Sequence, residues 1–274
     1  MSPTMKRVAL CTGAGSPKGI GAGILTFLAK LDYRVIVSDL GEHSTDESNG
    51  EITAAMQSVV DSITELGAQC IAIPCDVRDE NQVARLFDQA IEAYGQVDVL
   101  INNAGIGYLM KAFVDVPVEE WKLVMDVNLT GTFLCSQEAA RRMISAGNGG
   151  RIINIASQAA KTGFPHLAAY VASKHGLVGL TRSNACELGE HGITVNAICP
   201  NHITTELGAL QNAYYAELQG LTVPEYLAAM KNRIPMKRHC TADDVAAMVA
   251  FLASDNASYV TGESLNVSGG EETH

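Results

Sequence analysis

The chain is poor in basic residues, with 19 lysines and arginines against 30 aspartates and glutamates and a formal net charge of -11. Nucleic acids are bound by clustered Lys and Arg side chains, and here these residues are few and scattered. The sequence therefore predicts no nucleic-acid partner.

Metal-type cysteine pairs and long apolar runs are also missing. None of the seven cysteines forms a C-x-x-C pair, and their odd number favours free thiols in a reducing cytoplasm over disulfides or a zinc site. No apolar run approaches membrane-spanning length, and the N-terminus lacks the long apolar core of a signal peptide. We therefore expect a cytoplasmic protein without a metal or a membrane partner.

The 274 residues show no composition break, which predicts a single catalytic domain over 1–274. Short β-branched runs alternate with helical stretches, an order typical of βαβ units. Val83, Leu86, Phe87 and Ala90, for example, place apolar side chains on one helix face. The expected strands are 7–12, 34–38, 69–74, 97–101, 150–156, 193–198 and 263–267.

Right-handed crossovers arrange such units as an α/β fold, a doubly wound seven-stranded parallel sheet with helices on both faces in three α/β/α layers. A ligand crevice is then expected at the carboxyl ends of the strands. After the first strand the chain reads T-G-A-G-S-P-K-G-I-G over 12–21, followed by a helix near 20–31. Glycines permit close backbone approach, and a helix N-terminus attracts a pyrophosphate, so this turn predicts a dinucleotide site.

Asp39 ends the second strand, 18 residues after Gly21. A carboxylate at this place accepts hydrogen bonds from the adenosine ribose and repels a 2′-phosphate, which favours NAD over NADP. Lys18, inside the glycine turn, partly offsets the repulsion. An aspartate that only starts a turn is the simpler alternative.

Tyr170 and Lys174 are four residues apart, and Ser157 closes the strand before them. On a helix this spacing puts both side chains on one face. An ammonium about 4 Å from the phenol would supply roughly the 4 kcal/mol needed to lower a tyrosine pKa by about three units. The pattern predicts that Lys174 lowers the pKa of Tyr170 and makes it an acid and base.

Taken together, these motifs resemble the short-chain dehydrogenase/reductase family in its single-domain Rossmann-type branch, from about residue 6 to 270. The resemblance implies a catalytic tetrad in which Ser157 orients the substrate oxygen, Tyr170 exchanges its proton and Lys174 binds the nicotinamide ribose. The fourth member, Asn128, would position a proton-relaying water. The residues that carry the resemblance are Thr12, Gly13, Gly19, Gly21, Asp76, Asn102, Asn103, Ala104, Gly105, Asn128, Ser157, Tyr170 and Lys174.

The same resemblance implies which residues contact the cofactor. Asp76 and Val77 would flank the adenine, and Ile203 and Thr205 would contact the carboxamide. The full expected set is Gly13, Ser16, Gly19, Ile20, Gly21, Asp39, Asp76, Val77, Asn103, Ala104, Gly105, Tyr170, Lys174, Pro200, Ile203 and Thr205.

Two positions depart from the family pattern. The glycine turn is two residues longer than usual, and Pro17 has no N–H to give a phosphate. Asn201 follows Pro200 where the family has glycine. Because asparagine tolerates positive φ better than most residues, we expect that turn to survive.

Residues 206–238 resemble the mobile substrate cover of these enzymes. Polar residues beside Ser157, Tyr170 and Asn201 favour a polyol, sugar or other hydroxylated substrate, although a surface role is as good a reading for each. The expected substrate contacts are Ser157, Ala159, His166, Tyr170, His202 and Glu206, with Gln158 and Lys161 as further candidates.

The polar segment 40–50 is expected to be a surface loop, with folding over the adenosine as the alternative. The family resemblance also implies a homo-oligomer, a tetramer or else a dimer, paired through helices 118–130 and 168–188. The apolar residues expected there are Trp121, Val124, Met125, Leu177 and Leu180.

The sequence thus predicts an NAD-dependent oxidoreductase that interconverts a secondary alcohol and a ketone. Three alternatives stay open. One is an NADPH-dependent carbonyl reductase on a less polar ketone. The others are an epimerase or dehydratase and a non-catalytic dinucleotide-binding regulator on the same fold.

Overall fold

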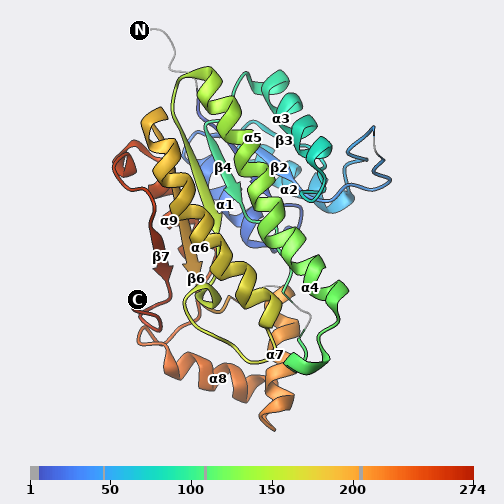
Figure 1. Cartoon of the computed structure of the whole chain (residues 1–274), viewed down its shortest axis with the longest axis vertical. Helices are drawn as coiled ribbons and strands as arrows, with labels where there is room; N and C mark the ends of the chain where they lie inside the picture. Colours follow the sequence, from blue (N-terminus) through green and yellow to red (C-terminus); the bar gives the residue numbers. More distant parts are fainter. Residues whose placement is uncertain (1–5, 46, 108–109, 204–205) are drawn as a thin grey trace.

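The computed structural model describes residues 6–45, 47–107, 110–203 and 206–274. Its centre is a seven-stranded parallel sheet in the order β3-β2-β1-β4-β5-β6-β7 (Figure 1). The prediction of a doubly wound sheet is confirmed, and each expected strand is present. The strands are β1 (Val8–Thr12), β2 (Arg34–Ser38), β3 (Cys70–Ala72), β4 (Val99–Asn102), β5 (Gly150–Ile155), β6 (Ile193–Pro200) and β7 (Ser264–Val267).

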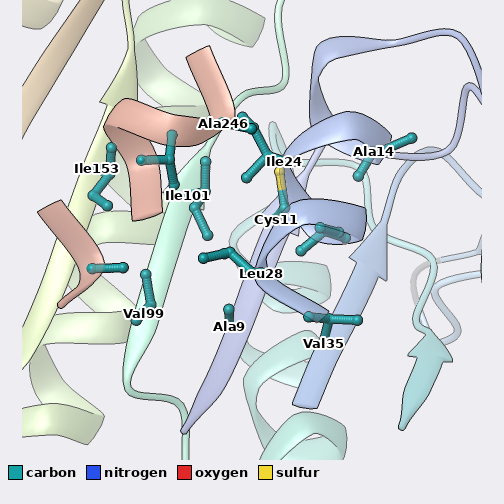
Figure 2. Close-up of a cluster of buried hydrophobic side chains, with 14 of the residues drawn as sticks. Ala9, Cys11, Ala14, Ile24, Leu28, Val35, Val99, Ile101, Ile153 and Ala246 are labelled. Atoms are coloured by element: carbon teal, nitrogen blue, oxygen red, sulfur yellow. The ribbon is translucent and has the colours of Figure 1, made fainter. Parts of the chain in front are cut away.

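Helices cover both faces of the sheet because the side chains of each strand alternate between two cores. Ala9 and Cys11 of β1 join the core under α1, α2 and α9, which Figure 2 shows in part. Val8 and Leu10 join the core under α3, α5 and α6. The helices are α1 (Ile20–Lys30), α2 (Ala54–Thr64), α3 (Glu80–Tyr94), α4 (Val118–Met125), α5 (Gly131–Ala146), α6 (Ala168–Leu188), α7 (Glu206–Leu218), α8 (Val223–Arg233) and α9 (Ala242–Ala253).

The segment expected to cover the substrate forms α7 and α8. Both helices lie beyond the carboxyl end of β6, at one end of the molecule (Figure 1). A capping box fixes the start of α8, in which the Thr222 hydroxyl and the Glu225 carboxylate satisfy each other's backbone N–H. The helices α7 and α8 thus cover the carboxyl ends of the strands, on the side where the crevice was expected.

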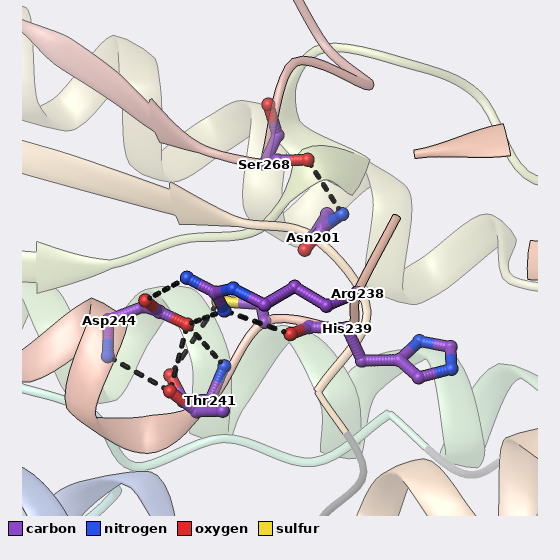
Figure 3. Close-up of polar contacts among 7 residues, drawn as sticks. Asn201, Arg238, His239, Thr241, Asp244 and Ser268 are labelled. Carbon is purple, nitrogen blue, oxygen red and sulfur yellow. Dashed lines mark hydrogen bonds and ion pairs between the residues drawn. The ribbon is translucent and has the colours of Figure 1, made fainter. Parts of the chain in front are cut away.

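The start of α9, the next helix after α8, is also fixed by a capping box. Thr241 and Asp244 form its capping box, and Arg238 binds the Asp244 carboxylate at 2.5 and 2.7 Å (Figure 3). Figure 3 also shows Asn201, at the end of β6, donating to the Ser268 carbonyl at 2.9 Å. Asn201 does not have positive φ, so the expected reason for its tolerance is wrong. Its side chain instead binds the segment that follows β7.

The described residues of 40–50 form a small surface hairpin, in which Glu42 pairs with Glu51 in an antiparallel bridge. Leu40 lines the cofactor cavity described below, and none of the described residues from 41 to 50 does, so only the first residue of the segment agrees with the alternative. One residue anchors the hairpin. The buried Asn49 donates to the carbonyls of Pro74 and Gln82 at 2.7 and 2.9 Å and accepts from Arg85 at 2.7 Å.

Replacing this anchor is expected to destabilise the fold. Asn49→Ala leaves two buried carbonyls without the amide that now binds them, which should lower the free energy of unfolding by about 2 to 3 kcal/mol. Chemical denaturation followed by circular dichroism measures this change. Ser44→Ala, at an exposed position of the same hairpin, is the control and should change it by less than about 0.5 kcal/mol.

The surface expected to form subunit contacts needs a correction. Val124 and Leu177 are each 1% exposed, because α4 and α6 pack against each other within one chain, so neither side chain is available to a partner. Apolar side chains that do remain exposed near these helices are Phe113, Val114, Val118, Trp121 and Phe133. In the described part of the chain no helix is both long and apolar enough to span a membrane.

Candidate active site

Hydrogen bonds join the glycine turn to the segment that follows β4. The Asn103 amide donates to the carbonyls of Thr12 and Gly13 at 3.0 and 2.7 Å. Gly13 has φ of +63°, and a Cβ there would lie 2.6 Å from the Cα of Ala104. Only glycine allows these two turns to meet so closely. The backbone is therefore left bare where β1 and β4 end together.

The two extra residues of the glycine turn form a tight turn of their own. The Gly19 N–H donates to the Ser16 carbonyl at 2.9 Å, which places Pro17 and Lys18 at the two central positions. Proline suits the first of these because its fixed φ matches the turn and no N–H is needed there. Gly19 then caps α1. α1 therefore begins directly after this turn, at Ile20.

A cavity of about 440 Å³ lies over this turn. Of the residues expected to bind the cofactor, ten line it: Gly13, Ser16, Gly19, Ile20, Asp39, Asp76, Val77, Asn103, Ala104 and Gly105. Gly21 does not, and a Cβ there would meet Ala14 at 2.8 Å, so it serves close packing. Bare glycine backbone, a helix N-terminus and a strand-end carboxylate are the features that a dinucleotide requires, so the residues present fit one.

Carboxylates mark the far end of this cavity. Asp39 accepts from the N–H groups of Gly15 and Leu40 at 2.7 and 2.8 Å. Asp76 is bound by the Arg78 guanidinium, which lowers the pKa of this half-buried carboxyl against the opposing effect of burial. Arg78 and Lys18 also line the cavity. Both signs of charge are therefore present there.

Ser157, Tyr170 and Lys174 meet at the ends of β5 and α6. Ser157 follows β5 and lies close enough to Tyr170 to lower the pKa of its phenol, and both residues line the same cavity. Lys174 is 4% exposed, and its Nζ donates to the Ile155 carbonyl at 2.8 Å and lies 5.6 Å from the centre of the Tyr170 ring. A Cβ on Gly107 would lie 2.7 Å from the same ring, so this glycine lets the chain after β4 pass across it.

Lys174 was expected to lower the pKa of Tyr170, and in the free protein this pKa is raised instead. Burial raises the pKa of Tyr170, the nearby Ser157 hydroxyl offsets part of the rise, and Lys174 is not among the causes. Burial also lowers the pKa of Lys174 to about 8. The cation is held by the Ile155 carbonyl and is itself desolvated, which explains why its help to the phenol is small.

Asn128 lies in a π-helical turn, Asp126–Thr130, between α4 and α5. Such turns often occur at functional sites. Its side chain is fully buried; it accepts from the Ile106 N–H at 2.8 Å and donates to the Ser173 hydroxyl at 3.1 Å. A Cβ on Gly105 would approach both Asn128 Oδ1 and Lys174 Nζ, at 3.3 and 3.6 Å. Asn128 is thus near the lysine, and its role toward a water stays a prediction.

A second cavity, of about 330 Å³, opens beside Ser157 and Tyr170 under α7 and α8. Ile20 lines both cavities, which places them next to each other. Ala159, His202, Gln158, Pro200 and Ile203 line this second cavity as well. It lies where a substrate would meet the tyrosine.

Other expected substrate contacts lie elsewhere or cannot be placed. His166, at φ of +65°, does not line this cavity; its Nδ1 lies 2.6 Å from the Tyr214 hydroxyl and ties the loop before α6 to α7. Lys161 likewise points to the chain end, where Nζ donates to the His274 carbonyl at 2.8 Å. Thr205 and the side chain of Glu206 lie outside the described residues.

Sequence reasoning placed Tyr215, Tyr226 and Met230 in the segment that covers the substrate without proposing them as contacts, and it missed Gln211 and Arg233. Tyr226, Met230 and Arg233 line the second cavity from α8, and Gln211 and Tyr215 line it from α7. The spacing 226, 230, 233 is that of one helix face, a signal that the sequence did contain. Among the described residues no group of three or more side chains is suited to hold a metal ion.

Comparisons with known proteins agree with this geometry. A family model described as enoyl-(acyl carrier protein) reductase matches residues 13–272. A short-chain dehydrogenase/reductase of Armillaria gallica is 38% identical, covering 98% of this chain and 97% of the relative. The 3-oxoacyl-(acyl-carrier-protein) reductase of Staphylococcus aureus is 37% identical, covering 97% and 98%.

This chain belongs to the short-chain dehydrogenase/reductase family. A solved structure of an actinorhodin polyketide ketoreductase variant with NADPH is also similar, with a TM-score of 0.89 and 36% identity over the whole of both chains. The protein is therefore an oxidoreductase of the NAD(P)-dependent short-chain type.

Proposed function

We propose that this protein is an NAD-dependent oxidoreductase that interconverts a secondary alcohol and a ketone on a hydroxylated small molecule, as a single catalytic domain. The observation that carries the proposal is that Ser157 and Tyr170 line the wall of one cavity, directly beside the cofactor cavity built on the glycine turn. A bound nicotinamide supplies the hydride chemistry. The protein supplies Tyr170 as acid and base and the residues that line the two cavities.

Each member of the tetrad has a distinct task in this proposal. Tyr170 takes the proton of the alcohol during oxidation and returns it during reduction. Ser157 holds the same oxygen, and Lys174 places a positive charge below the ring, where negative charge develops on the phenol. Asn128 fixes the chain around Ile106, which lines the cofactor cavity. Gln158, Gln211 and Gln219 line the substrate cavity and suit hydroxyl groups.

A panel assay tests the function directly. Polyols, sugars, hydroxy acids and simple secondary alcohols are incubated with NAD or NADP, and formation of the reduced cofactor is followed by its absorbance. Turnover of at least one hydroxylated secondary alcohol, faster with NAD, is the expected result. If tightly bound cofactor copurifies and no alcohol or ketone reacts in either direction, the epimerase or regulator alternatives replace this proposal.

The preference for NAD depends on the charge of Asp39. Asp39→Asn keeps an acceptor for the Gly15 N–H but removes the repulsion of a 2′-phosphate. We expect the ratio of kcat/KM for NADP to that for NAD to rise by about tenfold, roughly 1.4 kcal/mol. Glu65→Gln, at an exposed acidic position after α2, should leave the ratio unchanged. An unchanged ratio in Asp39→Asn as well rejects this role for the carboxylate.

An NADPH-dependent ketone reductase is the second candidate. Two observations favour it: Lys18 and Arg78 line the cofactor cavity, and the similar actinorhodin ketoreductase was solved with NADPH. Arg78 is already paired with Asp76, whereas the Asp39 side chain is bound only by backbone N–H groups among the described residues. This balance of charges is why we place NAD first. The same panel, run with ketones and both reduced cofactors, separates the two.

A homo-oligomer, a tetramer or else a dimer, is part of the proposal. The exposed apolar side chains around α4 and α5, such as Trp121 and Phe133 at 37% and 42% exposed, support it. The free state of all seven cysteines supports a reducing compartment such as the cytoplasm.

A further inference from the structure

The described wall of the substrate cavity carries one permanently charged side chain. Most of its polar residues are neutral, among them Gln158, Gln211 and Gln219. Arg233 is the exception, and no carboxylate accompanies it in the described part of the lining. The one permanent positive charge in the described lining is therefore on the side of α8.

Arg233 belongs to the face of α8 that turns toward the cavity. Met230 follows Tyr226 by four residues and Arg233 follows it by seven, which places the three on one face of the helix. Tyr226 and Met230 are each 8% exposed and line the same cavity. Burial, His239 and then Arg233 lower the pKa of His202 to about 4. His202 also lines the cavity, so the charge of the guanidinium reaches another side chain of the same lining.

Among the residues that the structure describes, Arg233 forms one ion pair, with Glu271 near the chain end. Glu271 Oε1 lies 3.4 Å from Arg233 Nη2, while its Oε2 accepts from Asn201 Nδ2 at 3.1 Å. Charge-assisted bonds of this kind usually measure about 2.7 to 2.9 Å, so this contact is long. A guanidinium has five donors in a planar fork, and one long contact leaves most of the fork available. The Arg233 side chain is 62% exposed and can be reached by a ligand.

We propose that the substrate carries an oxyanion, a carboxylate or a phosphate, which binds Arg233. Glu271 acts as the internal oxyanion that holds the guanidinium beside the cavity until the substrate group takes its place. The reacting alcohol or ketone then lies at Ser157 and Tyr170, with the anionic group toward the end of α8. This inference rests on the proposed function, because it names the substrate class of the same site.

Matched pairs of alcohols test the inference. Glucitol is compared with its 6-phosphate, and 3-hydroxybutyrate with its methyl ester, so that the two pairs separate a phosphate from a carboxylate. In the wild type, kcat/KM for one anionic member should exceed that of its neutral partner by at least about tenfold. Arg233→Met should remove this advantage while changing kcat/KM for the neutral partner by less than about threefold. Arg233→Lys should keep part of it, because it retains the charge but loses the fork.

Two further variants sharpen the test. Lys231→Met removes an exposed cation from the same helix but not from the cavity wall, and the anionic advantage should survive. Glu271→Gln keeps an acceptor for Asn201 and removes the competing charge, so KM for the anionic member should fall by about threefold. Equal kcat/KM for both members of each pair in the wild type, or equal losses for both in Arg233→Met, overturns the inference.

A binding measurement separates this inference from the proposed function. Inorganic phosphate and glucitol 6-phosphate are titrated by calorimetry into wild type and Arg233→Met, both saturated with NADH. Binding that the substitution weakens by at least about tenfold supports the anion site even if no compound in the panel turns over. In that case the proposed activity alone fails. Turnover of neutral alcohols without any binding of these anions rejects the anion site alone.

Discussion

Tyr170→Phe is expected to lower turnover by about 10³-fold, because the variant keeps the ring but has no proton to exchange. The dissociation constant for NADH should change by less than about threefold, since Tyr170 does not line the cofactor cavity. Stopped-flow absorbance measures the turnover, and fluorescence titration measures the binding. Burial raises the pKa of Tyr170, so alcohol oxidation by the wild type should also increase as pH rises above neutrality.

Tyr259→Phe is the matched control for this prediction. Tyr259 is fully exposed, and the same loss of one hydroxyl there should leave turnover unchanged. If Tyr170→Phe retains more than a tenth of wild-type turnover, the assignment of Tyr170 as acid and base is wrong. A comparable loss of NADH affinity would instead assign the tyrosine to binding.

Lys174→Met is expected to change activity and stability in opposite directions. Turnover should fall by about 10²-fold or more, because the buried positive charge below the tyrosine is lost. The free energy of unfolding at pH 7 should rise by about 1 to 3 kcal/mol, because burial lowers the pKa of Lys174 to about 8 and the folded protein holds this charge at a cost. The lost bond to the Ile155 carbonyl reduces the gain.

The pH dependence identifies the source of that gain. In the unfolded chain the lysine titrates near its ordinary pKa of 10.5, so between about pH 8 and 10.5 the unfolded state binds more protons than the folded state. Lys174 therefore contributes a rise in stability with pH across this window, and Lys174→Met should lack it. Urea denaturation at pH 7 and pH 9.5 measures both effects, with Lys30→Met, an exposed position in α1, as control. A less stable variant at pH 7 contradicts the reasoning.

The sheet was predictable because its information is local. Strands such as 34–38 are short β-branched runs, and the helices between them carry apolar residues on one face, so the period of the side chains alone fixes the elements. The handedness of βαβ crossovers then leaves few topologies. The glycine turn and the pair Tyr170 and Lys174 were predictable for the same reason, since each is a motif within one short segment.

Features that depend on distant segments were not predictable. The pKa of Tyr170 depends on burial by its surroundings and on the direction of the Lys174 ammonium, which bonds back to the Ile155 carbonyl. Sequence spacing gives the distance between two side chains on a helix but not their desolvation. Val124 and Leu177 were expected at a subunit contact, yet helices far apart in the sequence pack against each other and bury them.

By itself the sequence determined the order of strands and helices, the glycine turn and the spacing of the catalytic motif, because these depend on residues close together in the chain. Only the tertiary structure decided that Asn201 binds the segment after β7, that His166 holds α7, and that Arg233 reaches the substrate cavity beside Glu271. The bonded partners, Arg233 with Glu271, His166 with Tyr214 and Asn201 with Ser268, are 38 to 67 residues apart in the sequence. Side-chain periodicity carries no information at that range, and the packing of the whole chain has to bring the partners together.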